Sequence, residues 1–373
     1  MRVLITGADG FIGKNLLLHF NEMNTIECVS FTRSNSVDEL PELLEKVDLV
    51  FHLAGINRPK SADEFATGNV GLTELLCSAI NAGERAIPVV LTSSIQADLD
   101  NDYGRSKRAA EEALLALRKE TGNPVFIYRL PNVFGKLARP NYNSVVATFC
   151  HNIPRGIPIQ INDPSAVIPL VYIDDVIESF AKLLTEKTNK QDGFVEVAPI
   201  YSITVGELAD QLYRFKSSRD NLITEQVGKG LLRALYSTYV SYLPLESFSY
   251  GVKQYCDERG VFVEMLKTED SGQFSFFTAL PGVTRGGHYH HSKTEKFLVI
   301  KGEARFGFRH MVTGEYHEIY TSGDVSQIVE TVPGWAHDVT NVGDQELICM
   351  LWANEIFEPE KSDTFSCPVS ADD

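Results

Sequence analysis

Short apolar runs alternate with helical patterns from the start of the chain to about residue 215. Runs such as "RVLIT", "VDLVFHLAG", "IPVVLTSS" and "PVFIYRL" are separated by amphipathic stretches such as "GKNLLLHFNEM" and "SKRAAEEALLALRKE". Buried parallel strands crossed by helices produce this alternation. The pattern therefore predicts an α/β fold with a doubly wound parallel sheet of the Rossmann type.

From about residue 255 the pattern changes to short strands without helices. Segments such as "GQFSFFTAL", "EKFLVIKGEARFGFRH" and "ELICMLWAN" are separated by Gly, Pro and Asp turns, which indicates an all-β barrel or jelly roll. We place the boundary in "SYLPLESFSYG", which gives an N-terminal domain of residues 1–245 and a C-terminal domain of residues 246–373. The polar tail "EPEKSDTFSCPVSADD" is expected to fray.

Composition narrows the classes of function. A length of 373 residues suits two domains, and a net charge of -16 argues against a non-specific nucleic-acid binder or a protein that binds anionic membranes. No apolar stretch approaches the roughly 20 residues that a membrane span needs, and no signal-peptide pattern is visible. The six cysteines are widely spaced, and this spacing favours reduced thiols over a disulfide framework. We expect a cytoplasmic protein without nucleic-acid partners or membrane insertion.

The segment "TGADGFIG" places Gly7, Gly10 and Gly13 after the first predicted strand and at the start of a helix. Glycines there let the backbone turn tightly and approach a pyrophosphate at the helix N-terminus. A simple tight turn is the alternative, but the strand-loop-helix context favours a dinucleotide site. The second strand ends near Arg33, where an NAD enzyme has an acidic residue. An arginine suits a 2'-phosphate, so NADPH is favoured over the alternative of a surface arginine.

The segment "TSSIQADLDNDYGRSK" supplies Ser94, Tyr103 and Lys107. Tyr103 and Lys107 lie on one helical face, where we expect the ammonium to lower the phenol's pKa from about 10 and make it a general acid. Ser94 would hydrogen-bond the reacting carbonyl. The same spacing at Tyr289 and Lys293 follows no serine-ended strand, and we treat it as a coincidence.

Together with "HLAG", "YRLPNVFG" and "VYIDDV", these motifs stand in the order used by extended short-chain dehydrogenase/reductases that act on nucleotide sugars, and the chain resembles that family. The resemblance implies catalytic roles for Ser94, Tyr103 and Lys107. The cofactor-binding residues that it implies are Gly7, Gly10, Phe11, Ile12, Gly13, Arg33, Leu53, Ala54 and Lys107.

Two departures from the family pattern concern the substrate side. The gap between Ser94 and Tyr103 is short, and the arginine often found before "VYIDD" is replaced by "AVIPL". Lys136, Arg139 and Arg155 are therefore candidates to hold the substrate diphosphate. Solvated surface charge is an equally good interpretation of each.

A histidine cluster in "GVTRGGHYHHSKTEKFLVIKG" predicts a metal site. Residues two apart on a strand point the same way, so His288 and His290 can both face a barrel interior, with Glu295 on the next strand and His337 on a distant one. Three imidazoles and one carboxylate suit Zn, Fe, Mn or Ni, and we take zinc as the first candidate. His291 should point outward and has no ligand role.

This spacing resembles the two motifs of cupins. Upstream, "DERGVFVEML" is similar to a motif of deoxysugar-nucleotide 3,5-epimerases, which are themselves cupin-like and use a histidine in an "RG-x-H" context as the base. Here that position is His288, already assigned as a metal ligand, so the role does not transfer directly. Tyr289, Lys296 and Asp257 are the weaker candidates for a base.

A reductase of this kind joined to a cupin resembles the CapF-type (WbjC-type) bifunctional enzymes of capsule and O-antigen biosynthesis. The resemblance implies a homodimer in which the cupin epimerises C3 of a UDP-2-acetamido-2,6-dideoxy-4-hexulose and the reductase then reduces the C4 ketone with NADPH. The product would be a UDP-2-acetamido-2,6-dideoxy-L-talose, a precursor of N-acetyl-L-fucosamine polysaccharides. Three alternatives stay open: a purely structural or dimerising cupin, an NADP-binding sensor without turnover, and an iron-dependent cupin oxygenase.

Overall fold

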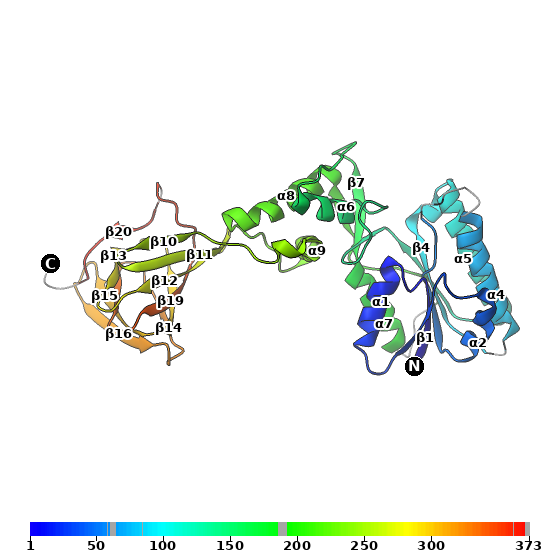
Figure 1. Cartoon of the computed structure of the whole chain (residues 1–373), viewed down its shortest axis with the longest axis horizontal. Helices are drawn as coiled ribbons and strands as arrows, with labels where there is room; N and C mark the ends of the chain where they lie inside the picture. Colours follow the sequence, from blue (N-terminus) through cyan, green and yellow to red (C-terminus); the bar gives the residue numbers. More distant parts are fainter. Residues whose placement is uncertain (58, 60–64, 84, 186–191, 361, 370–373) are drawn as a thin grey trace. The chain divides into compact units, whose positions relative to one another are not determined.

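The computed structural model describes residues 1–57, 59, 65–83, 85–185, 192–360 and 362–369. The chain divides into two compact units, each described here by itself (Figure 1). Unit 1 comprises Met1–Leu212 and Arg233–Pro244, and unit 2 comprises Tyr213–Leu232 and Leu245–Asp373.

Unit 1 is built around a parallel sheet with the strand order β2-β1-β3-β4-β5-β8. Its strands are β1 (Arg2–Thr6), β2 (Glu27–Phe31), β3 (Leu49–His52), β4 (Val89–Ser94), β5 (Val125–Leu130) and β8 (Gly193–Val195). Strand β2 lies on one side of β1, whereas β3 and the later strands lie on the other side. The direction in which strands are added therefore reverses between β1 and β3. This confirms the predicted Rossmann-type sheet, in which ligands bind beyond the carboxyl ends of the strands at such a reversal.

Helices cover both faces of this sheet. In Figure 1, α1 (Phe11–Asn21) and α7 (Ile173–Thr185) lie on one face, and α2 (Leu40–Glu45), α4 (Leu72–Ala82) and α5 (Asp102–Thr121) lie on the other. Leu4, Val50 and Leu114 belong to the buried core between the sheet and the second group of helices. Strands covered on both faces must be apolar throughout, which is why the sequence shows continuous apolar runs here.

Further helical segments occur before residue 248. They are η1 (Val37–Glu39), the π-helix η2 (Ala66–Gly71), η3 (Ile95–Asp98), α6 (Val145–Asn152), η4 (Ile153–Arg155), α8 (Val205–Asn221), α9 (Gly230–Ser241) and η5 (Leu245–Ser247). A small sheet has the order β6-β7-β9, with β6 (Asn132–Phe134), β7 (Val167–Tyr172) and β9 (Tyr201–Thr204). Within the described part of the chain, no helix combines the length and apolar character needed to cross a membrane.

Unit 2 contains two antiparallel sheets with the orders β10-β11-β12-β19-β14-β17 and β16-β15-β18-β13-β20. Their strands are β10 (Gln254–Asp257), β11 (Gly260–Thr268), β12 (Gly272–Ala279), β13 (Thr284–Tyr289), β14 (Glu295–Lys301), β15 (Glu303–His310), β16 (Tyr316–Ser322), β17 (Ile328–Glu330), β18 (Trp335–Asn341), β19 (Leu347–Ala353) and β20 (Phe365–Ser366). Phe277, Phe297 and Phe306 are among the side chains of the shared apolar core. The predicted all-β, cupin-like fold is confirmed.

The tail does not fray where the structure describes it. Strand β20 pairs with β13 and places Ser366 opposite His288, and the side chain of Val369 is 2% exposed. The expectation of a fraying tail is therefore wrong for residues 362–369, while residues 361 and 370–373 lie outside the described part. A two-residue strand in a polar segment carries too little periodicity for sequence patterns to detect.

Two glycines with similar backbone conformations provide a test of the packing in unit 1. Gly7 has φ +69° and a Cβ there would lie 2.7 Å from the backbone of Ala54, whereas Gly122 has φ +76° and open space around it. We expect Gly122→Ala to lower the free energy of unfolding by about 1–2 kcal/mol through the left-handed conformation alone. Gly7→Ala should cost more, because it adds a collision with β3's connecting loop. Urea unfolding of both variants checks this, and equal losses would contradict it.

Candidate active site and metal centre

The glycine loop of unit 1 lies at the carboxyl end of β1. The amide of Gly7 donates to the carbonyl oxygen of Phe31 at the end of β2 (2.8 Å), and the amide of Gly10 donates to that of Gly7 (2.9 Å). A Cβ at Gly13 would lie 2.4 Å from the Gly7 carbonyl oxygen, so the first turn of α1 packs directly on the loop. The N-terminus of α1, which begins at Phe11, therefore opens at the strand-order reversal, where backbone amides favour an anion.

The other predicted cofactor residues gather at the same edge of the sheet. Leu53 and Ala54 follow β3, and their amides donate to the backbone and hydroxyl oxygens of Thr6 at 3.2 Å and 3.3 Å. Ile12 lies in the first turn of α1, and Arg33 is exposed two residues beyond the end of β2. The structure thus brings the predicted dinucleotide-binding residues to one edge.

Ser94 and Tyr103 meet despite the short gap between them. Ser94 ends β4 and Tyr103 lies in the first turn of α5, and the Ser94 hydroxyl is near enough to the phenol to oppose the rise of its pKa. Gly104 makes this possible, because a Cβ there would lie 2.2 Å from the carbonyl oxygen of Gln96 in η3. The short gap is visible in the sequence. The role of the glycine beside Tyr103, which permits the short gap, is visible only in the structure.

Lys107 is buried behind this pair. Its ammonium donates to the carbonyl oxygen of Thr92 (3.1 Å) and lies 5.9 Å from the centre of the Tyr103 ring. Burial lowers the pKa of Lys107 to about 8, while the charge of Glu111 acts in the opposite direction. Burial raises the pKa of Tyr103, with the nearby Ser94 hydroxyl opposing it. The expected lowering of the phenol's pKa is therefore wrong for this arrangement, and the phenol holds its proton.

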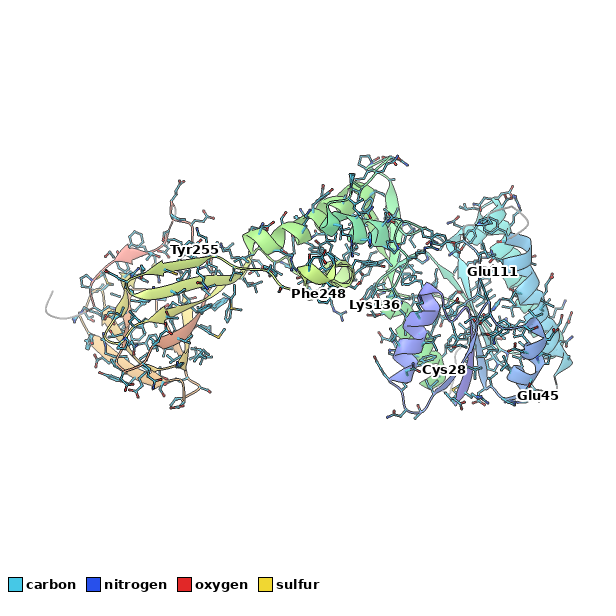
Figure 2. The ribbon with its side chains drawn as sticks, in the orientation of Figure 1. Cys28, Glu45, Glu111, Lys136, Phe248 and Tyr255 are labelled. Carbon is cyan, nitrogen blue, oxygen red and sulfur yellow. The ribbon has the colours of Figure 1, made fainter. Side chains whose placement is uncertain are left out.

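Glu111 is a buried carboxylate that sequence reasoning missed. It lies one turn beyond Lys107 on α5, is 2% exposed, and is labelled in Figure 2. It accepts hydrogen bonds from the Ser93 hydroxyl and from Arg129 Nε (3.0 Å) and Nη2 (2.6 Å). In "AAEEALLAL" it looks like a surface charge, and its partners lie on strands that only the fold brings near.

Polar contacts also fix the end of β3. The His52 imidazole is flanked by the hydroxyl groups of Thr6 (2.8 Å) and Thr73 (2.9 Å), and burial lowers its pKa to about 3. Beyond it, the Asn69 amide group donates to the Ser106 hydroxyl (2.9 Å) and so ties η2 to α5. These contacts hold the connection after β3 against the helix that carries Tyr103 and Lys107.

The three candidates for the diphosphate differ in their surroundings. Lys136, labelled in Figure 2, forms an ion pair with Asp174. The Arg155 guanidinium donates to two backbone carbonyl oxygens at 2.9 Å and 2.7 Å. Arg139 is exposed. Lys136 and Arg155 thus have intramolecular partners that account for their positions.

In unit 2, a glycine bulge aims the first histidine of the cluster. Gly286 and Gly287 have φ +92° and +76°, and the register of β13 against β18 shifts between Gly286 and His288. A Cβ at Gly286 would lie 2.9 Å from the His337 carbonyl oxygen, so this close crossing requires glycine. The bulge places His288 opposite His337, with ring centres 4.6 Å apart.

His288, His290, Glu295 and His337 meet with their ligand atoms within 4.8 Å of one another. Glu295 Oε2 lies 3.3 Å from Nε2 of both His290 and His337. A tetrahedral site with bonds of 2.0–2.1 Å separates its ligand atoms by about 3.3–3.4 Å. Nε2 of His337 is buried without a hydrogen-bond partner of good geometry among the described residues. The donor set therefore fits a divalent metal ion.

The protonation states in the cluster also suit metal binding. Burial lowers the pKa of His288 to about 4, so its imidazole is neutral at physiological pH. Burial alone would raise the pKa of Glu295, but the nearby imidazoles of His290 and His337 and the charge of Lys293 hold it well below its usual range. Neutral imidazoles and ionised carboxylates are the forms that bind metals.

A pocket of about 180 Å³ lies beside the cluster, lined by three cluster residues and by mainly apolar side chains. Arg285 and Asp338 add charge to its wall. Arg285 donates from Nε to the Thr278 carbonyl oxygen (2.9 Å), and its Nη2 lies 4.0 Å from the Asp257 carboxylate. The guanidinium therefore brings positive charge to the pocket wall.

The candidate bases suggested by sequence lie elsewhere. Asp257 forms an ion pair with the arginine two residues on, and Lys296 pairs with Glu330 at 3.0 Å. The Tyr289 ring stacks on Phe365 with a centroid separation of 5.3 Å. None of the three belongs to the lining that the described residues form around the pocket. His291 is exposed and lies outside the cluster.

Family comparisons agree with this geometry. Residues 3–198 match the NAD dependent epimerase/dehydratase family, and residues 255–365 match the polysaccharide biosynthesis C-terminal domain. The chain belongs to the NAD dependent epimerase/dehydratase family.

Individual proteins with similar sequences or structures give a more specific comparison than the family. The chain is 62% identical over 369 residues to the UDP-2-acetamido-2,6-beta-L-arabino-hexul-4-ose reductase of Pseudomonas aeruginosa, covering 99% of both chains. The crystal structure of the capsular polysaccharide assembling protein CapF from Staphylococcus aureus matches with 40% identity and a TM-score of 0.92, covering 99% of this chain and 100% of that one. A Bacillus cereus UDP-glucuronic acid 4-epimerase in complex with NAD, 18% identical, matches 65% of this chain and 98% of its own (TM-score 0.56) and shows the fold alone. The resemblance to CapF-type enzymes is confirmed.

The buried His52 should make stability depend on pH. Its folded-state pKa of about 3 lies below the ordinary value of 6.5, so its contribution is fully present above pH 6.5 and is lost as the pH falls from 6.5 towards 3. Between pH 6 and pH 5 the wild-type chain should lose about 1 kcal/mol more unfolding free energy than His52→Gln, which cannot titrate. Parallel curves from urea unfolding would contradict this.

Proposed function

We propose that the chain converts a UDP-2-acetamido-2,6-dideoxy-4-hexulose in two steps. The cupin-like domain inverts C3, and the reductase domain then reduces the C4 ketone with NADPH to give UDP-2-acetamido-2,6-dideoxy-L-talose for N-acetyl-L-fucosamine polysaccharides. We assign the reductase to residues 1–245 and the epimerase to residues 246–373. The names of the Pseudomonas aeruginosa reductase and of CapF support this substrate class.

One observation carries the proposal: the same chain holds two separate sets of groups, each suited to one step. Ser94, Tyr103 and Lys107 lie at the sheet edge that also carries the glycine loop. The other set is the three-histidine and glutamate cluster, which opens on a pocket in unit 2. A reductase alone has no need for the second set.

In the reductase site, Ser94 and Tyr103 hold the C4 oxygen between their hydroxyl groups. The raised pKa of Tyr103 keeps the phenol protonated until the oxygen gains negative charge, when it donates its proton. The buried Lys107 ammonium stabilises the phenolate that results. NADPH, when bound, supplies the hydride to C4.

In the epimerase site, the 4-ketone acidifies the neighbouring C3 proton, so that a base removes it to leave an enolate, and reprotonation from the opposite face inverts C3. The Arg285 guanidinium in the pocket wall supplies positive charge that stabilises an anionic oxygen. At about 180 Å³ the pocket is smaller than the roughly 300–1,000 Å³ typical of whole-ligand sites, so it suits the sugar ring rather than the nucleotide.

His288, His290, Glu295 and His337 would hold one divalent ion in this site, with zinc as the first candidate. Such an ion, when bound, supplies a Lewis acid that stabilises negative charge on oxygen. Epimerisation must come first, because reduction of the ketone removes the acidity of the C3 proton and locks the configuration.

We further propose a cytoplasmic homodimer. All six cysteines are free thiols, which agrees with a reducing compartment. The dimer rests on resemblance to CapF-type enzymes.

The central test follows deuterium at C3. Full-length Tyr103→Phe, incubated with UDP-2-acetamido-2,6-dideoxy-4-hexulose in deuterated water without NADPH, should incorporate deuterium at C3, observed by NMR. It should not oxidise NADPH, since the phenol that donates the proton is gone.

For the matched variant Glu295→Gln we expect the opposite result, with C3 exchange lost and reduction kept. Glu295→Gln should abolish C3 exchange yet still reduce the ketosugar whose C3 is already inverted, at a rate within a few-fold of wild type. If Glu295→Gln exchanges C3 as fast as wild type, the cluster serves structure only and the epimerase assignment fails. Oxygen consumption during turnover would point to an oxygenase instead.

Cofactor choice can be tested at Arg33. Its exposed guanidinium lies beyond the end of β2, where a 2'-phosphate would be held. Arg33→Ala should lower kcat/KM for NADPH by about 10–100-fold, the value of one charged hydrogen-bonded contact, and leave kcat/KM for NADH nearly unchanged. Steady-state kinetics with both cofactors measure this, and equal losses would refute the assignment.

A further inference from the structure

We propose that Asp363 and the short strand that follows it position the metal-binding loop, so that residues 362–369 set the metal affinity of unit 2 without supplying a ligand. This inference rests on the metal centre of the proposed function. It concerns a segment 70 or more residues further along the chain than the loop it holds.

The carboxylate of Asp363 is surrounded by hydrogen-bond donors from the loop between β13 and β14. It accepts from the backbone amides of His291 (3.0 Å), Ser292 (2.7 Å) and Lys293 (2.9 Å), and from the Ser292 hydroxyl (3.0 Å). Three consecutive amides that converge on one anion form a backbone nest. Because the loop joins His290 to Glu295, a fixed loop fixes the separation of two cluster residues.

A second contact acts on a cluster residue directly. The Nδ1 atom of His290 is hydrogen-bonded to the backbone carbonyl oxygen of Asp363. A carbonyl oxygen only accepts, so Nδ1 carries a proton, and Nε2 is the nitrogen left to bind a metal ion. Nε2 is the atom that lies 3.3 Å from Glu295 Oε2. The contact therefore selects the tautomer and ring orientation that a metal ligand needs.

The strand anchors this segment beside the cluster. Ser366 of β20 lies opposite His288 in the register with β13, and the amide of Cys367 donates to the Gly287 carbonyl oxygen (2.8 Å). Val369 is buried, and its carbonyl oxygen accepts from Arg309 Nε (2.7 Å). The position of Asp363 is thus set by the sheet and not by the loop alone.

Zinc affinity of the full-length chain tests the inference. After removal of metal with a chelator, wild type, Asp363→Asn and Asp363→Ala are titrated with Zn²⁺ in competition with a chromophoric chelator. Loss of a partner that orients a ligand typically costs 10–100-fold in metal affinity, so we expect Asp363→Ala to raise the Kd by that factor. Asp363→Asn should lie between, because its amide keeps one acceptor oxygen but no charge.

Two further variants guard against a general loss of folding. Asp344→Asn makes the same change of charge in the exposed turn between β18 and β19 and should keep wild-type affinity. Ser292→Ala removes only the hydroxyl contact and should weaken zinc binding less than Asp363→Ala does.

A purely structural role would leave a different signature. It would lower the Tm of the metal-free and zinc-loaded chains equally, whereas our inference requires the rise in Tm on adding zinc to shrink in Asp363→Ala. An Asp363→Ala Kd within twofold of wild type would overturn it. If wild type binds zinc no better than Glu295→Gln, the metal centre of the proposed function fails, and the inference falls with it.

Discussion

Both sites depend on one constraint: ionisable side chains must be nearly dry and yet keep partners for their polar atoms. An unpaired charge in the interior costs several kcal/mol, so each buried group needs compensation. The Lys107 ammonium donates a hydrogen bond to a backbone carbonyl oxygen, and the Glu111 carboxylate accepts two hydrogen bonds from one arginine. In unit 2, the Glu295 carboxylate is compensated by Lys293 and two imidazoles. The surrounding strands and helices bring each buried charge next to the groups that compensate it.

Burial also sorts the protonation states that the chemistry needs. The charged form is penalised in every case, so the phenol of Tyr103 and the imidazole of His288 both stay neutral. For the phenol, neutrality means that a proton is available to give. For the imidazole, it means that a lone pair is available to bind a metal. One physical effect thus gives the proposed proton donor of unit 1 and the proposed metal ligand of unit 2 the protonation states that they need.

The fold class could be predicted from the sequence because local periodicity encodes it, and the residues predicted for each site lie close together in the structure. Continuous apolar runs identify strands covered on both faces, and the spacing of His288 and His290 is the two-residue repeat of side chains on one face of a strand. What the sequence could not reveal depends on contacts between distant segments. Asp363 is separated from His291 by 72 residues, and Gly104 matters only because η3 packs against it.

The effect of Lys107 on Tyr103 illustrates a different limit. A spacing of four residues places two side chains on one helical face, but it does not determine how deeply each is buried. Burial turned out to dominate the pKa of both groups. The polar tail was missed for a related reason, since its pairing with β13 rests on backbone hydrogen bonds that residue type does not encode.

The place of Asp363 in the chain has a consequence for biosynthesis. All four cluster residues precede it, so a nascent chain on the ribosome presents its imidazoles before the carboxylate that orders them has been made. Unordered imidazoles bind divalent ions by their general affinity order and not by geometry. With the proposed metal centre, discrimination among divalent ions is therefore completed only after translation has passed Asp363, when β20 pairs with β13.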